Sequence, residues 1–312
     1  MTGPRLYQGS LQPRCFPSMP ANWVSESDTF PSADGKVLLY AALHHPRDWK
    51  GHRALIILHG FGEHGGRYLH FPHYLGASGQ PVVDAVYCLD HRGHGRSEGQ
   101  RGHVENFDDY SNDVVVTVNR LDAQLKQKFG KSEITLLGHS MGGLVGLRTL
   151  FQNPNLPIRA VAISAPLLGI RVPVPALKKL VAMTLTRLWG SLHMATDIDP
   201  RELSHDPEVV AAYAADRLVH KKITPRFFTE LQRAMADVMG RHEGFHYPMQ
   251  MMIPLKDQVV NPDRSLAFFE QLKLNEKKLI TYPDFFHEPF NEVGKEQVFA
   301  DLGGWVKANA GQ

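Results

Sequence analysis

The stretch EITLLGHSMGGLVGLRTLF, residues 133–151, decides the fold. An apolar run leads into the pentapeptide GHSMG, and a segment of helical character follows at once. Gly-x-Ser-x-Gly between a strand and a helix is typical of a nucleophile elbow, in which the serine occupies a strained turn that lifts its hydroxyl above a sheet. Side chains two residues to either side would collide in that turn. The pattern therefore predicts Ser140 as a nucleophile, with Gly138 and Gly142 permitting its turn.

A serine hydroxyl is a weak nucleophile that needs a base, and the base needs an acid to orient it. After residue 246 the chain contains a single histidine, His287, in a loop that directly follows the strand-like KLITYP. Asp257 follows the apolar MQMMIPL within two residues, again at a strand's carboxyl end, where such sheets build their sites. Asp263 is better explained as a helix N-cap, and Asp284 is too near His287 in sequence to approach its ring from the far side. We expect His287 as the base and prefer Asp257 as the acid.

Acyl transfer at such a serine also needs two backbone N–H donors for the oxyanion that develops on the substrate. Met141, the residue after the nucleophile, supplies one from the start of its helix. The other should come from the loop HGFGEHGGRY, residues 59–68, in which Gly60 and Gly62 let the backbone turn inward. We expect the N–H of Phe61 to be this second donor.

Short apolar runs alternate with helical segments along most of the chain, and a hairpin with a turn at SADG precedes them. The runs cover residues 54–60, 81–90, 133–140, 159–166, 247–255 and 278–283. The clearest helix is 107–129, whose apolar residues recur at spacings of three and four before Gly130 stops it. Strands that alternate with helices predict an α/β fold with a mostly parallel central sheet flanked by helices.

Between residues 167 and 246 this alternation stops, and no strand-like run is evident. The segment opens with an amphipathic pattern over 170–190, which predicts a helix that packs on its own domain or faces a membrane. Helix and loop inserted into a parallel-sheet protein suggest a cap, or lid. We expect an N-terminal extension (1–21), a core (22–166), the helical cap (167–246) and the rest of the core (247–312).

The composition indicates a soluble globular protein, with 43% hydrophobic and 21% charged residues and a net charge of +2. Without a block of basic residues, nucleic acid is not an expected partner. The cysteines, Cys15 and Cys88, make no disulfide framework, and Cys88 lies in an apolar run that predicts a buried free thiol. The N-terminus lacks a signal-peptide core, and no stretch approaches the ~18 apolar residues of a membrane span. A cytoplasmic location is the expectation.

Two further motifs contain pairs of histidines that could bind a metal or could be structural. RHEGFHYP, residues 241–248, contains the zinc pattern His-Glu-x-x-His, but Gly240, Gly244 and Pro248 oppose the helix that this pattern requires. We therefore expect no metal, and place His242 and His246 where the cap rejoins the core. DHRGHGRSEG, residues 90–99, is expected to be structural, with a tight turn at its glycines and with its arginines paired to local acids.

Four stretches resemble the monoacylglycerol lipase and lysophospholipase family of α/β-hydrolases: LHGFGEHGGRY, LDHRGHGRSEGQRGHVENFDDYSNDV, LLGHSMGG and YPDFFHEPFNE. The resemblance extends from about residue 25 to 308 and implies hydrolysis of an ester of one long acyl chain, with no cofactor. It also implies a lid that contacts membrane or micelle surfaces. The predicted catalytic and oxyanion residues match family positions. Glu63 and His139 are implied to line the end of the site that holds glycerol.

The sequence thus predicts a serine hydrolase of single-chain lipid esters, with monoacylglycerol as the preferred substrate. A lysophospholipase, or a carboxylesterase or thioesterase of broader acyl specificity, is the alternative on the same scaffold. A binding module that has lost catalysis is disfavoured because the nucleophile, base and acid are all present. Aspartate-based chemistry on a related scaffold is disfavoured by the serine at position 140.

Overall fold

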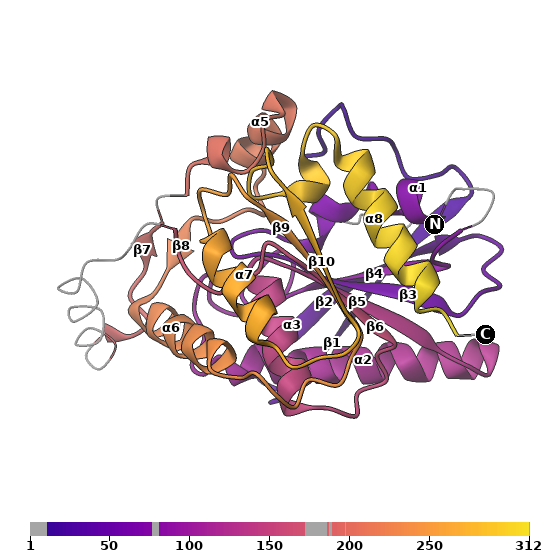
Figure 1. Cartoon of the computed structure of the whole chain (residues 1–312), viewed down its shortest axis with the longest axis horizontal. Helices are drawn as coiled ribbons and strands as arrows, with labels where there is room; N and C mark the ends of the chain where they lie inside the picture. The colour runs from indigo at the N-terminus through magenta and orange to yellow at the C-terminus, as the bar shows by residue number, and fades with distance from the viewer. Residues whose placement is uncertain (1–10, 77–80, 172–185, 187–188, 197, 312) are drawn as a thin grey trace.

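An eight-stranded sheet runs through the centre of the molecule (Figure 1). The computed structural model describes residues 11–76, 81–171, 186, 189–196 and 198–311. In spatial order the strands are β1 (Trp23–Pro31), β2 (Leu38–Pro46), β4 (Ala85–Asp90), β3 (Arg53–Leu58), β5 (Glu133–His139), β6 (Ala160–Ser164), β9 (Met249–Pro254) and β10 (Lys277–Tyr282). The strands from β4 to β10 pair in parallel, and β1 and β2 add an antiparallel edge. The expected mostly parallel α/β sheet is confirmed.

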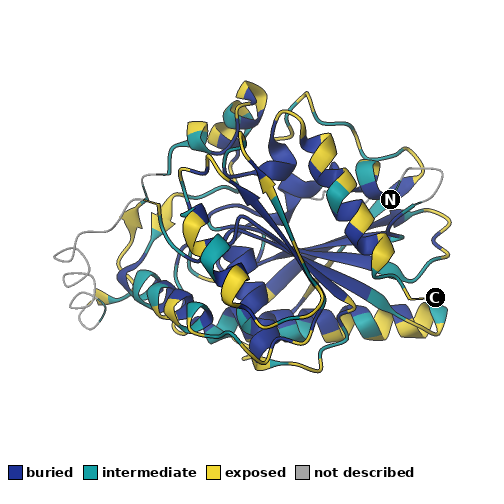
Figure 2. Cartoon of the chain, in the orientation of Figure 1, coloured by how far each residue is buried: buried dark blue, intermediate teal, exposed yellow. Residues whose placement is uncertain are grey.

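Helices cover both faces of this sheet, which explains why its inner strands are apolar on both sides. In β3, Ile56 and Leu58 face one hydrophobic cluster, while Leu55 and Ile57 face the other. The first cluster includes residues of α2 (Asp108–Phe129), α3 (Met141–Gln152), α6 (Pro225–Met239) and α7 (Pro262–Gln271). The second includes residues of α1 (Phe71–Gly76) and α8 (Lys295–Ala308). Figure 2 shows the inner strands of the sheet buried, and most of the surrounding helices exposed on their outer faces.

Several boundaries differ from the sequence prediction for local reasons. β4 begins at Ala85 rather than at residue 81, because Val82 and Val83 donate their N–H groups to the Leu75 carbonyl oxygen of α1 and not to a neighbouring strand. The prediction that Asp263 is the N-cap of α7 is wrong. Asn261 holds that position: its side chain accepts the Asp263 N–H at 2.9 Å, and Pro262 starts the helix one residue earlier. The expectations of a long α2 ending before Gly130 and of a buried Cys88 are confirmed.

The described part of the segment between β6 and β9 contains helices, two short strands and irregular loops. Its described elements are β7 (Met194–Ala195), a 3-10 turn at Pro200–Glu202, α5 (Pro207–Ala215), β8 (Lys222–Ile223) and α6. The pairing of β7 with β8 corrects the expectation of no strand here, since two residues are too few to show a period of two. The predicted amphipathic helix over 170–190 falls largely outside the described residues.

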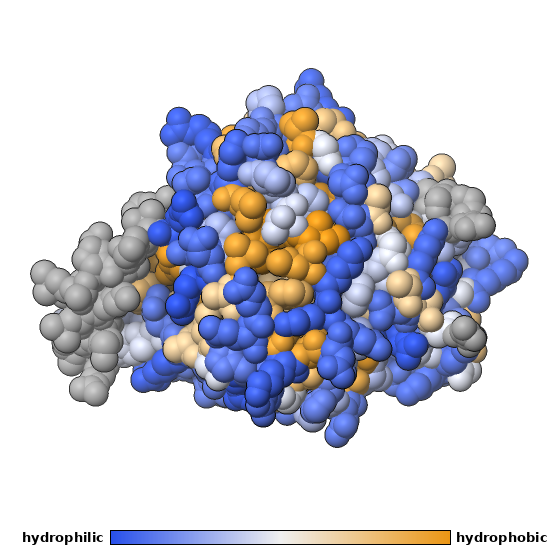
Figure 3. All heavy atoms as spheres, viewed as in Figure 1, coloured by the Kyte–Doolittle hydropathy of each residue, from blue (hydrophilic) through white to orange (hydrophobic). Residues whose placement is uncertain are grey.

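The surface combines hydrophilic margins with a hydrophobic area over the middle of one face, where β9 and β10 lie (Figure 3). In the described part of the inserted segment, Trp189, Leu192 and Met194 are exposed by 62%, 53% and 36%. No helix among the described residues is long and apolar enough to cross a membrane.

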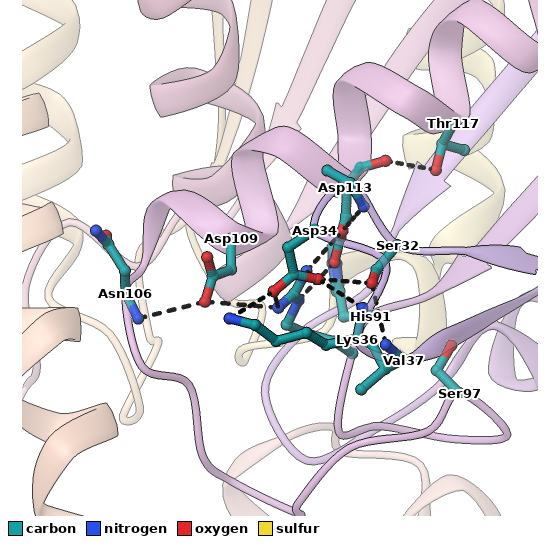
Figure 4. Close-up of polar contacts among 12 residues, drawn as sticks. Ser32, Asp34, Lys36, Val37, His91, Ser97, Asn106, Asp109, Asp113 and Thr117 are labelled. Atoms are coloured by element: carbon teal, nitrogen blue, oxygen red, sulfur yellow. Dashed lines mark hydrogen bonds and ion pairs between the residues drawn. The ribbon is translucent and has the colours of Figure 1, made fainter.

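The DHRGHGRSEG motif fastens the β1–β2 hairpin to α2. Arg92 donates to both carboxylate oxygens of Asp113, at 2.6 and 2.8 Å, and to Asp34 in the hairpin turn, with Asp109 3.5 Å away. Figure 4 shows the carboxylates of Asp34, Asp109 and Asp113 close to one another. Arg96 donates its backbone N–H to Asp90. The Arg92 contacts agree with the structural interpretation of this motif.

Candidate active site

Ser140 occupies the sharp turn between β5 and α3. Its backbone has φ 53° and ψ −117°, a conformation that costs an L-residue energy and persists only where the surroundings enforce it. A methyl group at Gly142 would lie 2.0 Å from the Leu58 carbonyl oxygen, and one at Gly138 would lie 2.6 Å from the Gly142 oxygen. Only glycine fits at both positions, so the turn brings α3 directly against the ends of β3 and β5.

The structure brings the three residues predicted to act together into one hydrogen-bonded chain. His287 Nε2 lies 3.0 Å from Ser140 Oγ, and His287 Nδ1 lies 2.7 Å from Asp257 Oδ2. The other Asp257 oxygen accepts the backbone N–H groups of Val259 and Val260, at 2.8 and 2.9 Å. These bonds hold the fully buried carboxylate in place beside the imidazole.

The electrostatics favour a proton-accepting role for this imidazole. Burial lowers the pKa of His287, but the charge of Asp257 and the hydrogen bond to it outweigh burial and leave the pKa raised above its usual value. The His139 ring lies 4.9 Å from the His287 ring. Burial and the positive charge of a protonated His287 lower the pKa of His139 to about 3, so His139 is neutral at pH 7.

The β3–α1 loop lies against the serine turn. A methyl group at Gly60 would come within 3.2 Å of the Ser140 side chain, so the loop approaches the hydroxyl as closely as a glycine allows. Phe61 follows directly and lines the same cavity as Ser140. Met141 is the first residue of α3, where backbone N–H groups have no partner within the helix. Phe61 and Met141 thus flank the serine from two elements, and their role as oxyanion donors stays a prediction.

The Glu63 side chain stabilises the β3–α1 loop through hydrogen bonds. Its carboxylate accepts the Gly60 N–H at 2.6 Å, the Tyr68 hydroxyl at 2.9 Å and the Arg67 guanidinium at 2.5 Å. Arg67 also binds both oxygens of Glu288, at 2.6 and 2.7 Å. Burial raises the pKa of Glu288, but the Arg67 charge overcomes this effect and lowers it to about 2. Arg67 and Glu288 were not predicted as site residues from the sequence, although they lie in the motifs LHGFGEHGGRY and YPDFFHEPFNE.

A cavity of about 530 Å³ opens above these residues, within the size range of ligand sites. Its polar end consists of Glu63, His139, Ser140, His287 and Glu288. Residues of the inserted segment line much of the rest, and most of them are apolar: Leu167, Ile170, Ala195, Thr196, Ile198, Glu202, Leu203, Tyr213, Ile223, Phe227, Phe228 and Leu231. The arrangement places the Ser140 side chain among the polar residues of an otherwise apolar cavity.

The zinc-like motif lies elsewhere and lacks the required geometry. Residues 240–248 form a loop between α6 and β9, not a helix, so His242 and His246 do not share a helical face. Among the described residues no group of three or more His, Cys, Asp or Glu side chains is arranged to hold a metal ion.

A mostly parallel sheet with a serine raised at the β5–α3 turn makes the molecule an α/β-hydrolase. The family described as serine aminopeptidase, S33, matches residues 50–294, and the chain belongs to that family. A monoacylglycerol lipase of Mycolicibacterium smegmatis is 30% identical over 255 residues, which cover 81% of this chain and 87% of that protein. The phospholipase YtpA of Bacillus subtilis is 28% identical over 255 residues, covering 80% of this chain and 95% of that one.

A crystal structure of a monoacylglycerol lipase from Paleococcus ferrophilus is also similar, with a TM-score of 0.75 and 26% identity. The similarity covers 87% of this chain and 99% of that chain. The resemblance seen in the sequence motifs is thereby confirmed at the level of the family.

Proposed function

We propose that the protein hydrolyses monoacylglycerol to glycerol and a fatty acid through an acyl-enzyme on Ser140. The supporting observation is the bonded chain from Ser140 through His287 to Asp257, at the polar end of an apolar cavity. Neutral His287 takes the hydroxyl proton as Ser140 attacks the ester carbonyl, and Asp257 stabilises the resulting imidazolium. The N–H groups of Phe61 and Met141 stabilise the oxyanion. Protonated His287 then gives its proton to the leaving alcohol, and water releases the acid by the same route.

The charges around the polar end favour a neutral head group. Of the described residues that line the cavity, Glu63, Glu202 and Glu288 are acidic and none is lysine or arginine. Arg67 lies behind Glu63 and Glu288 and is bonded to both. A phosphate group would therefore approach carboxylates across a poorly solvated space, which is unfavourable, whereas glycerol hydroxyls can donate to them. Neutral His139 and Glu63 are proposed to contact the glycerol.

The segment 167–246 is proposed to act as the cap over this cavity, inserted between core segments 22–166 and 247–312. Its contribution to the cavity lining supports this division. We further propose that the cap contacts a membrane or micelle surface through Trp189, Leu192 and Met194, whose exposed apolar side chains suit an interface. Flotation with neutral lipid vesicles would test this contact against a variant with serine at all three positions.

The activity is tested by measuring fatty-acid release, with EDTA present, from monooleoylglycerol, oleoyl lysophosphatidylcholine and oleoyl lysophosphatidylglycerol. We expect the glyceride to be the preferred substrate, and the anionic lysophospholipid to be the poorest. Ser140→Ala should retain only the residual rate that binding and the oxyanion donors provide. Near-wild-type turnover in this variant would exclude the mechanism.

The phospholipase among the relatives makes lysophospholipase the second candidate. A preference for either lysophospholipid would retain the roles of Ser140, His287 and Asp257 but contradict the charge argument. Activity only on short esters or thioesters would point to broader acyl specificity. Loss of activity in EDTA would contradict the absence of a metal from the mechanism.

A further inference from the structure

The backbone on both sides of His287 is fastened to one short piece of the inserted segment, residues 203–205. On one side, Glu288 donates its backbone N–H to the Leu203 carbonyl oxygen, 2.9 Å away. On the other side, the Phe286 N–H donates to the Glu292 carboxylate at 3.0 Å. That carboxylate also binds His205. His287 therefore lies between two attachments to the same piece of chain.

Glu292 is the centre of the second attachment. Its side chain is buried, with 1% of the residue exposed. One oxygen accepts from the Phe286 N–H and lies 2.7 Å from His205 Nδ1. The other accepts the Val293 N–H at 2.9 Å and the Ser204 hydroxyl at 3.3 Å, and the His205 N–H points between the two oxygens. A buried carboxylate that accepts from donors of two segments holds those segments in a fixed relation, because its loss would take this acceptor from the backbone N–H groups of Phe286 and His205. The Ser204 hydroxyl also has a second acceptor, the Asn291 carbonyl oxygen 2.9 Å away.

Ring packing reinforces the same contact. The imidazole of His205 stacks on the ring of Phe286, with centroids 3.7 Å apart and an interplanar angle of 25°. Phe286 directly precedes His287 in the chain. The stack and the Glu292 bonds therefore restrain the backbone immediately before the imidazole.

The position of this loop matters because Asp257 alone does not fix the reacting nitrogen. The bond from Asp257 to Nδ1 orients the ring, but Nε2 lies on its far side, 3.0 Å from Ser140 Oγ. A shift of the loop backbone would lengthen that second distance, and a misplacement of about 1 Å can cost about 100-fold in rate. Leu203, which binds Glu288, also lines the cavity, so the fastening piece borders the substrate space.

We infer that Glu292 is a positioning residue, which holds the His287 loop at hydrogen-bonding distance from Ser140 through the Phe286 N–H and through His205. Glu292 is not one of the described residues that line the cavity, so it acts on the reaction through His287 and not on the substrate. The inference rests on the proposed roles of Ser140 and His287, and adds the residue that sets the distance between them.

The test compares Glu292→Gln and His205→Ala in the full-length chain. Glutamine keeps the size of the side chain but replaces one acceptor oxygen with an NH2 group, which cannot accept from the N–H donors. The hydrogen bonds that hold residues 203–205 to the His287 loop are therefore weakened. His205→Ala removes the ring stack and the Nδ1 contact at a position whose side chain is 45% exposed, where folding should tolerate the change. Matched controls are Glu296→Gln, at an exposed position of α8, and His193→Ala, whose ring binds Gln100 and the Arg101 carbonyl.

The kcat and KM for p-nitrophenyl butyrate are measured together with the melting temperature, and active sites are counted with a fluorophosphonate. We expect kcat per active site to fall by about 10- to 100-fold in Glu292→Gln, with KM near the wild-type value and the chain still folded. His205→Ala should lose less, because its backbone N–H remains. Both controls should match the wild type.

The inference is overturned if both variants fold and turn over like the wild type, or if the loss disappears when rates are counted per active site. It is also overturned if KM changes and kcat does not. Failure of the proposed function is a different result: a wild-type chain without esterase activity, or Ser140→Ala with full activity. The two failures are therefore distinguishable.

Discussion

At the scale of single residues, the balance that sets the pKa of His287 can be inverted. Burial lowers this pKa and Asp257 raises it, with the raising effect dominant. In Asp257→Asn the raising effect is lost and burial prevails, so the pKa should fall below 6.5. Since the reaction needs neutral His287, the acid limb of kcat/KM should move to lower pH. The rate itself should fall by about 10⁴-fold, because asparagine favours the wrong tautomer.

The pH dependence of p-nitrophenyl butyrate hydrolysis in single turnovers measures both effects. Asp284→Asn is the control, because Asp284 is the other aspartate close to His287, three residues before it in the sequence. Its side chain is 81% exposed and paired with Lys256, so this variant should keep the wild-type rate and pH profile. An acid limb that moves to higher pH in Asp257→Asn would contradict the assigned balance.

The glycine at position 142 offers a test of packing. A methyl group there would meet the Leu58 carbonyl oxygen at 2.0 Å, and backbone cannot move aside cheaply. We expect Gly142→Ala to lower the free energy of unfolding by about 1–3 kcal/mol and to abolish most activity. Gly304→Ala in α8, where no atom lies within 4 Å of the added methyl, should raise that free energy by up to about 1 kcal/mol. Urea denaturation compares the two, and equal stabilities would contradict the steric argument.

Residue-scale prediction from the sequence succeeded where chemistry and chain order constrain the choice. The three residues that the structure joins by hydrogen bonds were predicted from their order along the chain (serine, acid, histidine) and from their positions at the ends of strands. Arg67 and Glu288 were missed because their contact spans 221 positions and depends on how two loops meet. Asp263 was misassigned because Asn261, two residues earlier, competes for the same capping role.

At the scale of elements, the apolar runs predicted the parallel strands well because a strand buried on both faces must be apolar throughout. The inserted segment was harder. α5 has nine residues, and β7 and β8 have only two each, so these three elements give little periodicity that the sequence could reveal. α6 is longer, with 15 residues, and its buried residues recur at helical spacing, but it was not predicted as a separate helix. The N-terminal segment, for which sequence analysis found no role, contacts both α5 and the core.

This N-terminal contact can be tested by truncation. The Leu11 N–H donates to Asp216, Cys15 binds Asp206 and Glu208 around α5, and Phe16 packs on His70 of the core at 4.2 Å. Removal of residues 1–16 should free α5, so that hydrogen exchange over 207–215 accelerates about tenfold or more while β3 and β5 stay protected. Removal of residues 1–10 leaves these bonds in place and serves as the control. Equal exchange in both truncations would show that the segment does not tether α5.

At the scale of the whole molecule, the proposed active site is built from two parts of the chain, the core and the inserted segment. In the proposed mechanism, core segments 22–166 and 247–312 supply the nucleophile, the base, the acid and the N–H donors. The inserted segment supplies most of the apolar wall, and it also meets the loop that holds His287. Acyl specificity is therefore expected to depend on the inserted segment, and bond cleavage on the core.

A wall substitution separates these two contributions. Leu231 of α6 is buried and lines the cavity, so Leu231→Trp should fill space that a long acyl chain needs. One methylene in an apolar pocket changes specificity by about 10-fold or more, and we expect kcat/KM for monooleoylglycerol to fall at least that far relative to p-nitrophenyl acetate. Arg233→Trp places the same side chain on the solvent side of α6, where the Arg233 side chain is 73% exposed, and should leave the ratio unchanged. If Leu231→Trp lowers both rates equally in a folded chain, the cavity next to α6 is not the acyl site, and the long-chain preference must have another origin.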